Sequence, residues 1–394
     1  MHRRTLLQAL AAMPLTTVAG RLFAAPATSA KLLVVFLRGG YDAATLLVPI
    51  ASQFYYQARP TIAVPRPSAE PQAALPLDAD WGLHPALRDT VYPLFQKKQV
   101  AFVAFAGTDD LSRSHFATQD SIELGQALDG SRNLQSGFLN RLVSVLTGVE
   151  PMAFTDQLPL VLRGDARVPN MALKSVGKAS LDPRQSGIIG AMYQGTRLAA
   201  HVREGFEMRD NVSRELAQEM EAANRQAITT KGFEMEARRI ATLMRERFNL
   251  GFVDVGGWDT HVVQGGAVGY LAGRLDELGR GLAGFADAMG PAWSETVVVV
   301  ISEFGRTFRE NGNRGTDHGH GTVYWVLGGS IRGGRVVGEQ TRLEPGTLFQ
   351  DRDYPVLNEY RTVFGGLFVR MYGLSAGQLD RVFAGVQPRD IGLV

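Results

Sequence analysis

Cysteine is absent from all 394 residues of the chain. The fold therefore contains no disulfide, and a metal site built on paired cysteines is excluded. Any metal ion would have to be held by histidine, carboxylate, hydroxyl or backbone oxygen.

A strong excess of one charge is also missing. The chain has 41 basic and 39 acidic residues, mixed along its length, and a net charge of +2. This balance gives no reason to expect nucleic-acid binding. The length allows a large buried core and suggests two units, or one large α/β domain that carries an insertion.

The N-terminal hydrophobic stretch is too short to span a bilayer comfortably. It runs from Leu6 to Val18 and is broken by Pro14, whereas a membrane helix needs about 20 apolar residues. Residues 1–30 have a basic start, an apolar middle and small residues near the end, which is the layout of a secretory signal. We therefore predict export, with cleavage between Ala25 and Lys31 and no stable membrane anchor.

The signal has two adjacent arginines. Arg3-Arg4 followed by Thr5, Leu6 and Leu7 resembles a twin-arginine signal, which would make the twin-arginine export machinery a partner of this chain. The predicted location is the periplasm or the outside of the cell. An ordinary secretory signal is the alternative, because paired arginines also occur there by chance.

Short, continuous apolar runs alternate with segments of helical pattern. The runs that we expect as buried strands are 31–37, 100–106, 249–255, 296–301 and 322–327. The segments that we expect as helices are 84–99, 116–127, 268–289 and 359–372. Strand, helix and strand in succession predict an α/β domain over 31–394 with a mostly parallel sheet. Residues 133–250 are predicted to form a mainly helical segment within it.

Three of the predicted strands lead into a carboxylate. Asp42 follows the first strand, Asp259 follows the strand that begins at Asn249, and Glu303 follows the strand that begins at Thr296. In open α/β sheets the ligand crevice lies beyond the carboxyl ends of the strands. If the strands are neighbours, crowded carboxylates need compensation by two divalent cations, or by one cation with Arg38 and Arg306.

Histidines lie near two of these carboxylates. Asp259 is followed by His261, and a glycine-rich loop after Glu303 contains Asp317, His318 and His320. Histidine and carboxylate without thiolate suit zinc, manganese or iron better than calcium, and we expect zinc or manganese. Each motif also has a simpler interpretation. Asp259 could cap the next helix, the glycine-rich loop could be a plain turn, and Asp42 could be a turn residue that pairs with Arg38.

A second polar group lies at the predicted start of a helix. Ser112, Arg113, Ser114 and His115 stand where free N–H groups and the helix dipole favour an anion. Either serine could be a nucleophile. Either could instead be the helix N-cap, which is the commoner role.

Five motifs of the chain resemble those of a known family. FLRGGYDA, SRSHFATQD, GGWDTH, SEFGRT and GTDHGHG are similar to the family called domain of unknown function 1501, and their order resembles the alkaline-phosphatase and sulfatase superfamily. The resemblance implies a three-layer αβα fold. It also implies that Asp42 and Glu303 bind one metal, while Asp259, His261 and His318 or His320 bind another.

The resemblance also suggests a reaction. Ser114 or Ser112 would supply the attacking hydroxyl, with Arg113 and His115 beside it, and Arg113 or Arg306 would bind the oxygens of a small anionic ester. The implied function is a metal-dependent hydrolase of phosphate or sulfate esters. The superfamily has Asp-His where this chain has Glu303-Phe304, which removes one imidazole unless His115 or His318 replaces it. The alternative function is therefore a non-catalytic envelope protein that binds a ligand or partner with the same fold.

Overall fold

A computed structural model describes residues 29–173, 183–207 and 232–394. The predicted signal at residues 1–30 therefore lies almost entirely outside the described residues. Within the described ranges, no helix combines the length and the apolar character that crossing a membrane would require.

The centre of the domain is an eight-stranded sheet in which β1 (Lys31–Leu37) lies between β8 and β7. The order along the sheet is β10-β5-β9-β8-β1-β7-β6, and β11 also pairs with β5. The other strands are β5 (Val100–Gly107), β6 (Pro151–Ala153), β7 (Leu250–Val255), β8 (Thr296–Ser302), β9 (Thr322–Gly328), β10 (Arg335–Val337) and β11 (Asn358–Glu359). All five predicted strands are confirmed, because continuous apolar runs mark strands that are buried on both faces.

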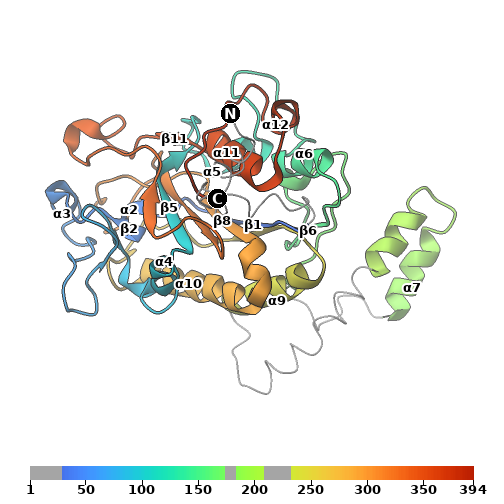
Figure 1. Ribbon diagram of the computed structural model, residues 1–394, viewed down its shortest axis with the longest axis horizontal. Coiled ribbons are helices and arrows are strands. Elements are labelled where there is room, and N and C mark those ends of the chain that lie inside the picture. Colours follow the sequence, from blue (N-terminus) through green and yellow to red (C-terminus); the bar gives the residue numbers. More distant parts are fainter. Residues whose placement is uncertain (1–28, 174–182, 208–231) are drawn as a thin grey trace, which may run out of the picture.

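Helices cover both faces of the sheet (Figure 1). Leu33, Val35 and Leu37 of β1 pack on the face that carries α4 (Val91–Gln96), α9 (Phe233–Glu246) and α10 (Tyr270–Met289). The alternate residues Leu32 and Val34 pack on the opposite face. The helices of that face are α5 (His115–Leu124), α6 (Phe138–Val145), α11 (Tyr360–Tyr372) and α12 (Ala376–Val382). The predicted three-layer αβα fold is therefore confirmed.

One interior strand runs against the others. β9 pairs antiparallel with both β5 and β8, whereas the remaining pairs of this sheet are parallel. Parallel neighbours need a crossover, usually a helix, but residues 303–321 between β8 and β9 contain none. The chain turns back at the edge of the sheet where β8 ends, so both ends of this connection lie there.

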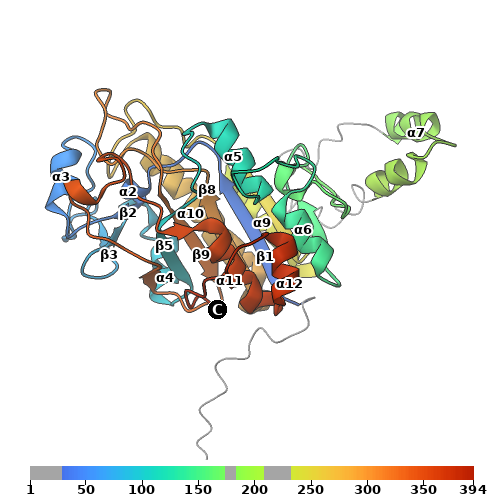
Figure 2. The same ribbon diagram turned by 90° about the horizontal axis from the view of Figure 1, so that it is seen from above.

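The remaining elements of the domain are short, apart from those of the segment 133–250. The predicted helix over 84–99 consists of two short pieces, a 3₁₀ turn at Pro85–Leu87 and α4, because the chain leaves helical geometry at Thr90. Other short elements are α2 (Ala43–Leu46), α3 (Gln53–Ala58), β2 (Leu47–Val48), β3 (Leu75–Pro76), β4 (Gly82–Leu83) and 3₁₀ turns at Leu160–Leu162, Gly290–Glu295 and Pro345–Thr347. The segment 133–250 contains α6, β6, α9 and α7 (Pro183–Met192), and Figure 2 shows α7 standing away from the α/β body.

Candidate metal centre

The three strands that lead to carboxylates are neighbours in the order β8-β1-β7, as the sequence suggested. They also end at the same level, because Leu37 lies opposite both Ser302 and Val255. The loops that follow them therefore start side by side. Which side chains meet depends on how each loop leaves the sheet.

The turn after β1 passes very close to the other two loops. Gly39 and Gly40 have φ values of 125° and 60°, which favour glycine. A Cβ on Gly39 would lie 2.7 Å from the Asp259 backbone nitrogen, and one on Gly40 would lie 2.4 Å from the Phe304 ring. The two glycines therefore allow the three loops to pack together.

This turn carries Asp42 away from the histidines. Arg59 donates to both carboxylate oxygens of Asp42 at 2.5 and 3.0 Å, and Thr45 and Gln264 donate at 2.6 Å each. Burial alone would raise the pKa of Asp42, but the Arg59 guanidinium lowers it below its ordinary value. The expected convergence of Asp42 with the other two carboxylates is therefore wrong. Arg38, the other partner considered, pairs instead with Glu123 and Asp254.

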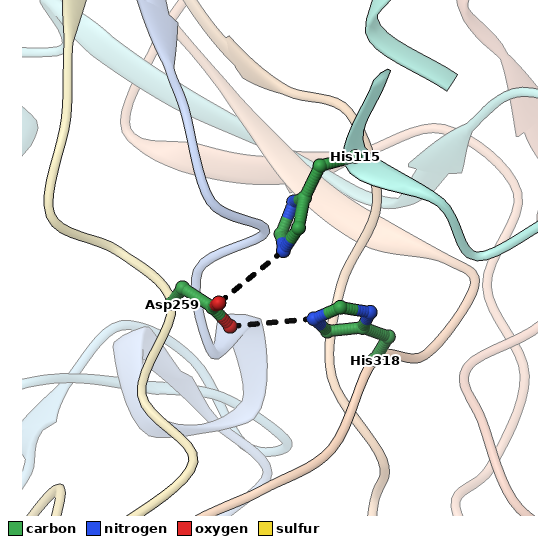
Figure 3. Close-up of side chains that lie close together, drawn as sticks. All are labelled: His115, Asp259 and His318. Carbon is green, nitrogen blue, oxygen red and sulfur yellow. Dashed lines mark hydrogen bonds and ion pairs between the residues drawn. The ribbon is translucent and has the colours of Figure 1, made fainter. Parts of the chain in front are cut away.

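Asp259 is the centre of a cluster of three histidines, two of which, His115 and His318, are shown beside it in Figure 3. Nε2 of His115 lies 3.4 Å from Oδ2 of Asp259, and Nε2 of His318 lies 3.3 Å from Oδ1. His261 places its own Nε2 2.9 Å from the same Oδ1. One ligand atom from each of His115, Asp259 and His318 lies within 4.8 Å of the others, so these residues form a possible metal-binding group.

Each imidazole of the cluster is fixed through its other nitrogen. Nδ1 of His115 contacts Glu303 Oε1 at 2.8 Å, Nδ1 of His318 contacts the Arg113 carbonyl oxygen at 3.0 Å, and Nδ1 of His261 contacts Asp317 Oδ1 at 3.2 Å. Carboxylate and carbonyl oxygens only accept hydrogen bonds, so Nδ1 must be the donor in all three rings. When the rings are neutral, each lone pair is therefore on Nε2, the atom directed at Asp259.

This arrangement leaves an electrostatic conflict that a cation would relieve. Nε2 of His261 and Nε2 of His318 are 3.0 Å apart, so two lone pairs face each other in the neutral rings, and Nη1 of Arg306 lies 3.4 Å from Nε2 of His261. Nε2 of His115 is buried and makes no hydrogen bond within the described part of the chain, although Oδ2 of Asp259 lies 3.4 Å away. Histidines held through Nδ1 by an oxygen acceptor, with Nε2 directed inward, are typical of metal sites.

The local charges act differently on the members of the cluster. Burial would raise the pKa of Asp259, but Arg306, which donates to Oδ1, lowers it. The hydrogen bond to Glu303 raises the pKa of His115 against the opposing effect of burial. Burial and the nearby His115 lower the pKa of His318. The lowered pKa of His318 favours its neutral form, which is the form that binds a metal ion.

Glu303 holds His115 and is itself fully engaged. Its Oε1 accepts from the Gly39 backbone nitrogen, His115 and Gln119 at 2.8 to 2.9 Å, and its Oε2 accepts from Ser302 at 2.9 Å. Burial would raise the pKa of Glu303, but these donors lower it. We expected Glu303 to be a metal ligand. The structure instead places its carboxylate behind His115, outside the group around Asp259.

Glu303→Gln is expected to weaken metal binding without abolishing it. A glutamine amide no longer forces Nδ1 of His115 to be the donor, so the ring loses its fixed tautomer and orientation. Loss of such a partner typically costs about 10- to 100-fold in metal affinity. Competition titration against a metal-sensitive dye measures the change. An affinity equal to that of the wild type would contradict this role for Glu303.

Two further predicted ligands have other surroundings. Asp317 accepts from His261 and from Asn311, so it orients a ring and lies behind the cluster. His320 is buried against Phe349, with ring centroids 4.8 Å apart, and burial lowers its pKa to about 4. The sequence left His318 and His320 as alternatives, and the structure brings only His318 to Asp259.

The predicted nucleophiles and anion-binding residues have structural partners. Ser114 is the N-cap of α5 and accepts from Ala117 at 3.4 Å, while the Ser112 hydroxyl contacts Thr118 at 3.1 Å. Arg113 donates to Asp353 at 2.8 and 3.0 Å. Arg306 is buried and donates to the carbonyl oxygens of Gly39, Gly40, Trp258 and Thr316 as well as to Asp259. Both guanidiniums are therefore engaged by a carboxylate; the Arg306 side chain is fully buried, whereas that of Arg113 remains 26% exposed.

Comparison with known proteins identifies the family. The family model described as "Protein of unknown function (DUF1501)" matches residues 29–383. The chain belongs to the DUF1501 family. No protein with a curated description matches it.

Similarity of this DUF1501 chain to solved structures is weak. One is "Crystal structure of Ps i-CgsB in complex with k-i-k-neocarrahexaose", with 9% identity and a TM-score of 0.36. Another is "Crystal structure of Ps i-CgsB", with 10% identity and a TM-score of 0.37. Each comparison covers 92% of this chain and 75% of the other.

The five motifs of this DUF1501 chain contain most of the cluster and its supports, but sequence reasoning missed four partner residues. These are Arg59 and Gln264, which hold Asp42, Gln119, which holds Glu303, and Asp353, which holds Arg113. Arg59 lies within the proline-rich stretch from Ile50 to Asp80, which has no periodic pattern. Gln119 does lie within the SRSHFATQD motif, one helical turn after His115, which could have indicated that both side chains share a helix face.

Proposed function

We propose that this DUF1501 protein is an exported, metal-dependent hydrolase of phosphate or sulfate esters, related to the alkaline-phosphatase and sulfatase superfamily. The observation that carries the proposal is the set of three Nε2 atoms directed at one carboxylate, each ring fixed through Nδ1. His115, His261, His318 and Asp259 would hold the ion. Nitrogen and oxygen ligands of this kind suit zinc or manganese.

The chain's own residues prepare the reaction. A divalent ion would act as a Lewis acid and would lower the pKa of a bound hydroxyl or water. Glu303 and Asp317 keep two imidazoles oriented, and Arg306 holds the Asp259 carboxylate. Ser114 directly precedes His115, and its capping bond of 3.4 Å is longer than the usual 2.7–3.2 Å, so the hydroxyl is only weakly held. Ser114 is therefore the preferred attacking group, with Ser112 as the alternative.

The export signal predicted at residues 1–30 is consistent with the proposal. The twin-arginine machinery transports folded proteins, so an ion could be loaded before the protein reaches the periplasm or the outside of the cell. A cluster that includes one carboxylate and three imidazoles should couple metal binding to folding. We therefore expect the exported protein to be more stable with its ion than without it.

Hydrolysis of aryl phosphates and aryl sulfates by the purified chain from residue 29 onward tests the proposal. We expect activity that is lost on chelation and restored by zinc or manganese. Ser114→Ala should abolish turnover while the metal content stays at the wild-type level, and loss of turnover in Ser112→Ala instead would assign the attack to Ser112. Stoichiometric metal without hydrolysis of any ester of either class would contradict the proposal.

The pairing of Arg113 and Arg306 with carboxylates favours a second function. Arg113 and Arg306, which we expected to bind an anionic ester, each already pair with a carboxylate of this chain. We therefore keep as the alternative a non-catalytic envelope protein whose site binds a ligand or partner. Little bound metal, together with a melting temperature that chelation does not change, would favour this alternative.

A further inference from the structure

Exposed apolar side chains are concentrated beside the cluster. Among the described residues, eleven large hydrophobic side chains are exposed, and six of them lie in two short segments, 111–116 and 262–270. These segments contain or directly follow two histidines of the cluster. The six residues, which we call the apolar rim, are Leu111, Phe116, Val262, Val263, Val268 and Tyr270. Four of the other five lie in the segment 188–198, so the rim is the larger group.

The cluster brings the two segments of the rim together. Phe116 is 84% exposed and follows His115, while Val262 is 62% exposed and follows His261. The ring centroids of His115 and His261 lie 4.2 and 4.8 Å from that of His318, which stands between them. Phe116, in α5, and Val262, in the loop after β7, are therefore the chain neighbours of two histidines that meet at His318.

Tyr270 extends the rim on the side of Asp259. Its hydroxyl donates to the Gly257 carbonyl oxygen at 3.2 Å, two residues before Asp259. The hydroxyl is thus fixed to the loop that carries Asp259, while the residue remains 55% exposed.

The loop that carries the valines has a defined shape. The backbone nitrogens of Val263 and Gln264 donate to the carbonyl oxygens of Asn313 and Arg314 at 2.9 and 3.0 Å, and Asn311 donates to the His261 carbonyl oxygen. Val263 has a φ of 47°, which is unfavourable for a β-branched residue and persists only where the surroundings impose it. The valines are therefore held outward by the fold.

We propose that the apolar rim binds the hydrocarbon part of an amphiphilic anionic ester whose phosphate or sulfate group lies at the cluster. This inference rests on the proposed function and specifies its substrate class. A bound cation would attract the anionic head, and the rim offers apolar contact next to it. Clustered exposed hydrophobic residues around a polar centre are typical of a ligand-binding surface.

Binding of ligands that cannot be hydrolysed tests the rim separately from catalysis. Alkyl sulfonates of two to ten carbons, kept below their micelle concentration, are titrated into metal-loaded protein by calorimetry. Each fully buried methylene should tighten the Kd by up to about fourfold. Phe116→Ser with Val262→Thr should flatten this dependence. Leu134→Ser, which changes another exposed leucine outside the rim, should leave it unchanged.

Hydrolysis of the matching alkyl phosphates and sulfates completes the test. We expect kcat/KM to rise with chain length for the wild type and the Leu134→Ser control, and to stay flat for the rim variant. Turnover of short esters without any effect of chain length would contradict the role proposed for the rim, while the proposed hydrolase function would remain. Binding that depends on chain length, without turnover, would contradict the hydrolase function but support the binding role of the rim. Rim-dependent binding to anionic vesicles, without tighter binding of longer sulfonates, would also overturn this substrate class.

Discussion

Asp259→Asn should remove the metal and abolish hydrolysis. Asp259 is the carboxylate on which three Nε2 atoms converge, and asparagine keeps its shape while removing its charge. Removing a residue that only orients a metal ligand typically lowers metal affinity by about 10- to 100-fold. Removing the central ligand itself should lower the affinity by more than that. The bound metal is measured by atomic emission after gel filtration, and hydrolysis is measured on the same sample.

Two aspartate variants calibrate this result. Asp287→Asn changes an exposed aspartate on α10 that also pairs with an arginine, and it should bind metal as the wild type does. Asp317→Asn removes the hydrogen bond that orients His261. Its metal affinity should lie between those of the other two variants, about 10- to 100-fold below that of the wild type. If Asp259→Asn retained a full equivalent of metal, the centre would have to be assigned to other residues.

Arg59→Met should cause the largest loss of stability, without loss of metal. The Arg59 and Asp42 side chains are both buried, and their ion pair has an N–O distance of 2.5 Å. Removing one partner leaves a buried charge uncompensated, which typically destabilises a protein by about 3–5 kcal/mol. Unfolding in guanidinium chloride measures the free energy of unfolding, and the metal content of the folded protein is expected to stay at the wild-type level.

The double variant Asp42→Asn with Arg59→Met serves as the control. With both charges gone, most of the lost stability should return, because replacing both partners of a buried pair is far less costly than replacing one. Asp42→Asn alone also distinguishes the two roles considered for Asp42. Loss of metal in this variant at unchanged fold would return Asp42 to the metal centre.

The same pair predicts how stability depends on pH. The pKa of Asp42 in the folded protein is below its ordinary value of about 3.9, so the carboxylate stabilises the fold above that pH. This contribution is lost as the pH falls through the lowered folded value. In Arg59→Met, burial without the guanidinium should raise the pKa of Asp42. The difference in unfolding free energy between wild type and Arg59→Met should therefore shrink as the pH is lowered below 4.

The fold was predictable because its strands are continuous apolar runs. Lys31–Leu37 was predicted with the same bounds that β1 has, and the three-layer arrangement followed from the succession of strands and helices. The adjacency of the loops that carry Asp42, Asp259 and Glu303 also followed from the strands. A position at the end of a strand, however, does not determine where the side chain points.

The roles of individual side chains depended on partners with no sequence signature. Asp42 is directed away by the turn at Gly39-Gly40 and is held by Arg59, which lies 17 residues later in a segment without pattern. Glu303 faces His115, so a residue that was expected to bind metal instead orients a ring. His115 was placed near the reaction, but its alignment with Asp259 required the three-dimensional structure.

The reversed direction of β9 has a consequence for how the protein would respond to losing its ion. Residues 303–321 leave one core strand and enter its neighbour, and they are cross-linked by backbone bonds from Gly305 to His320 and from Thr307 to Asp317. Glu303, Arg306 and His318 thus all lie in the connection 303–321, whose two ends continue into the central strands β8 and β9. Loss of the ion should therefore increase amide exchange at the ends of β8 and β9 deep in the core, and not only in a peripheral flap.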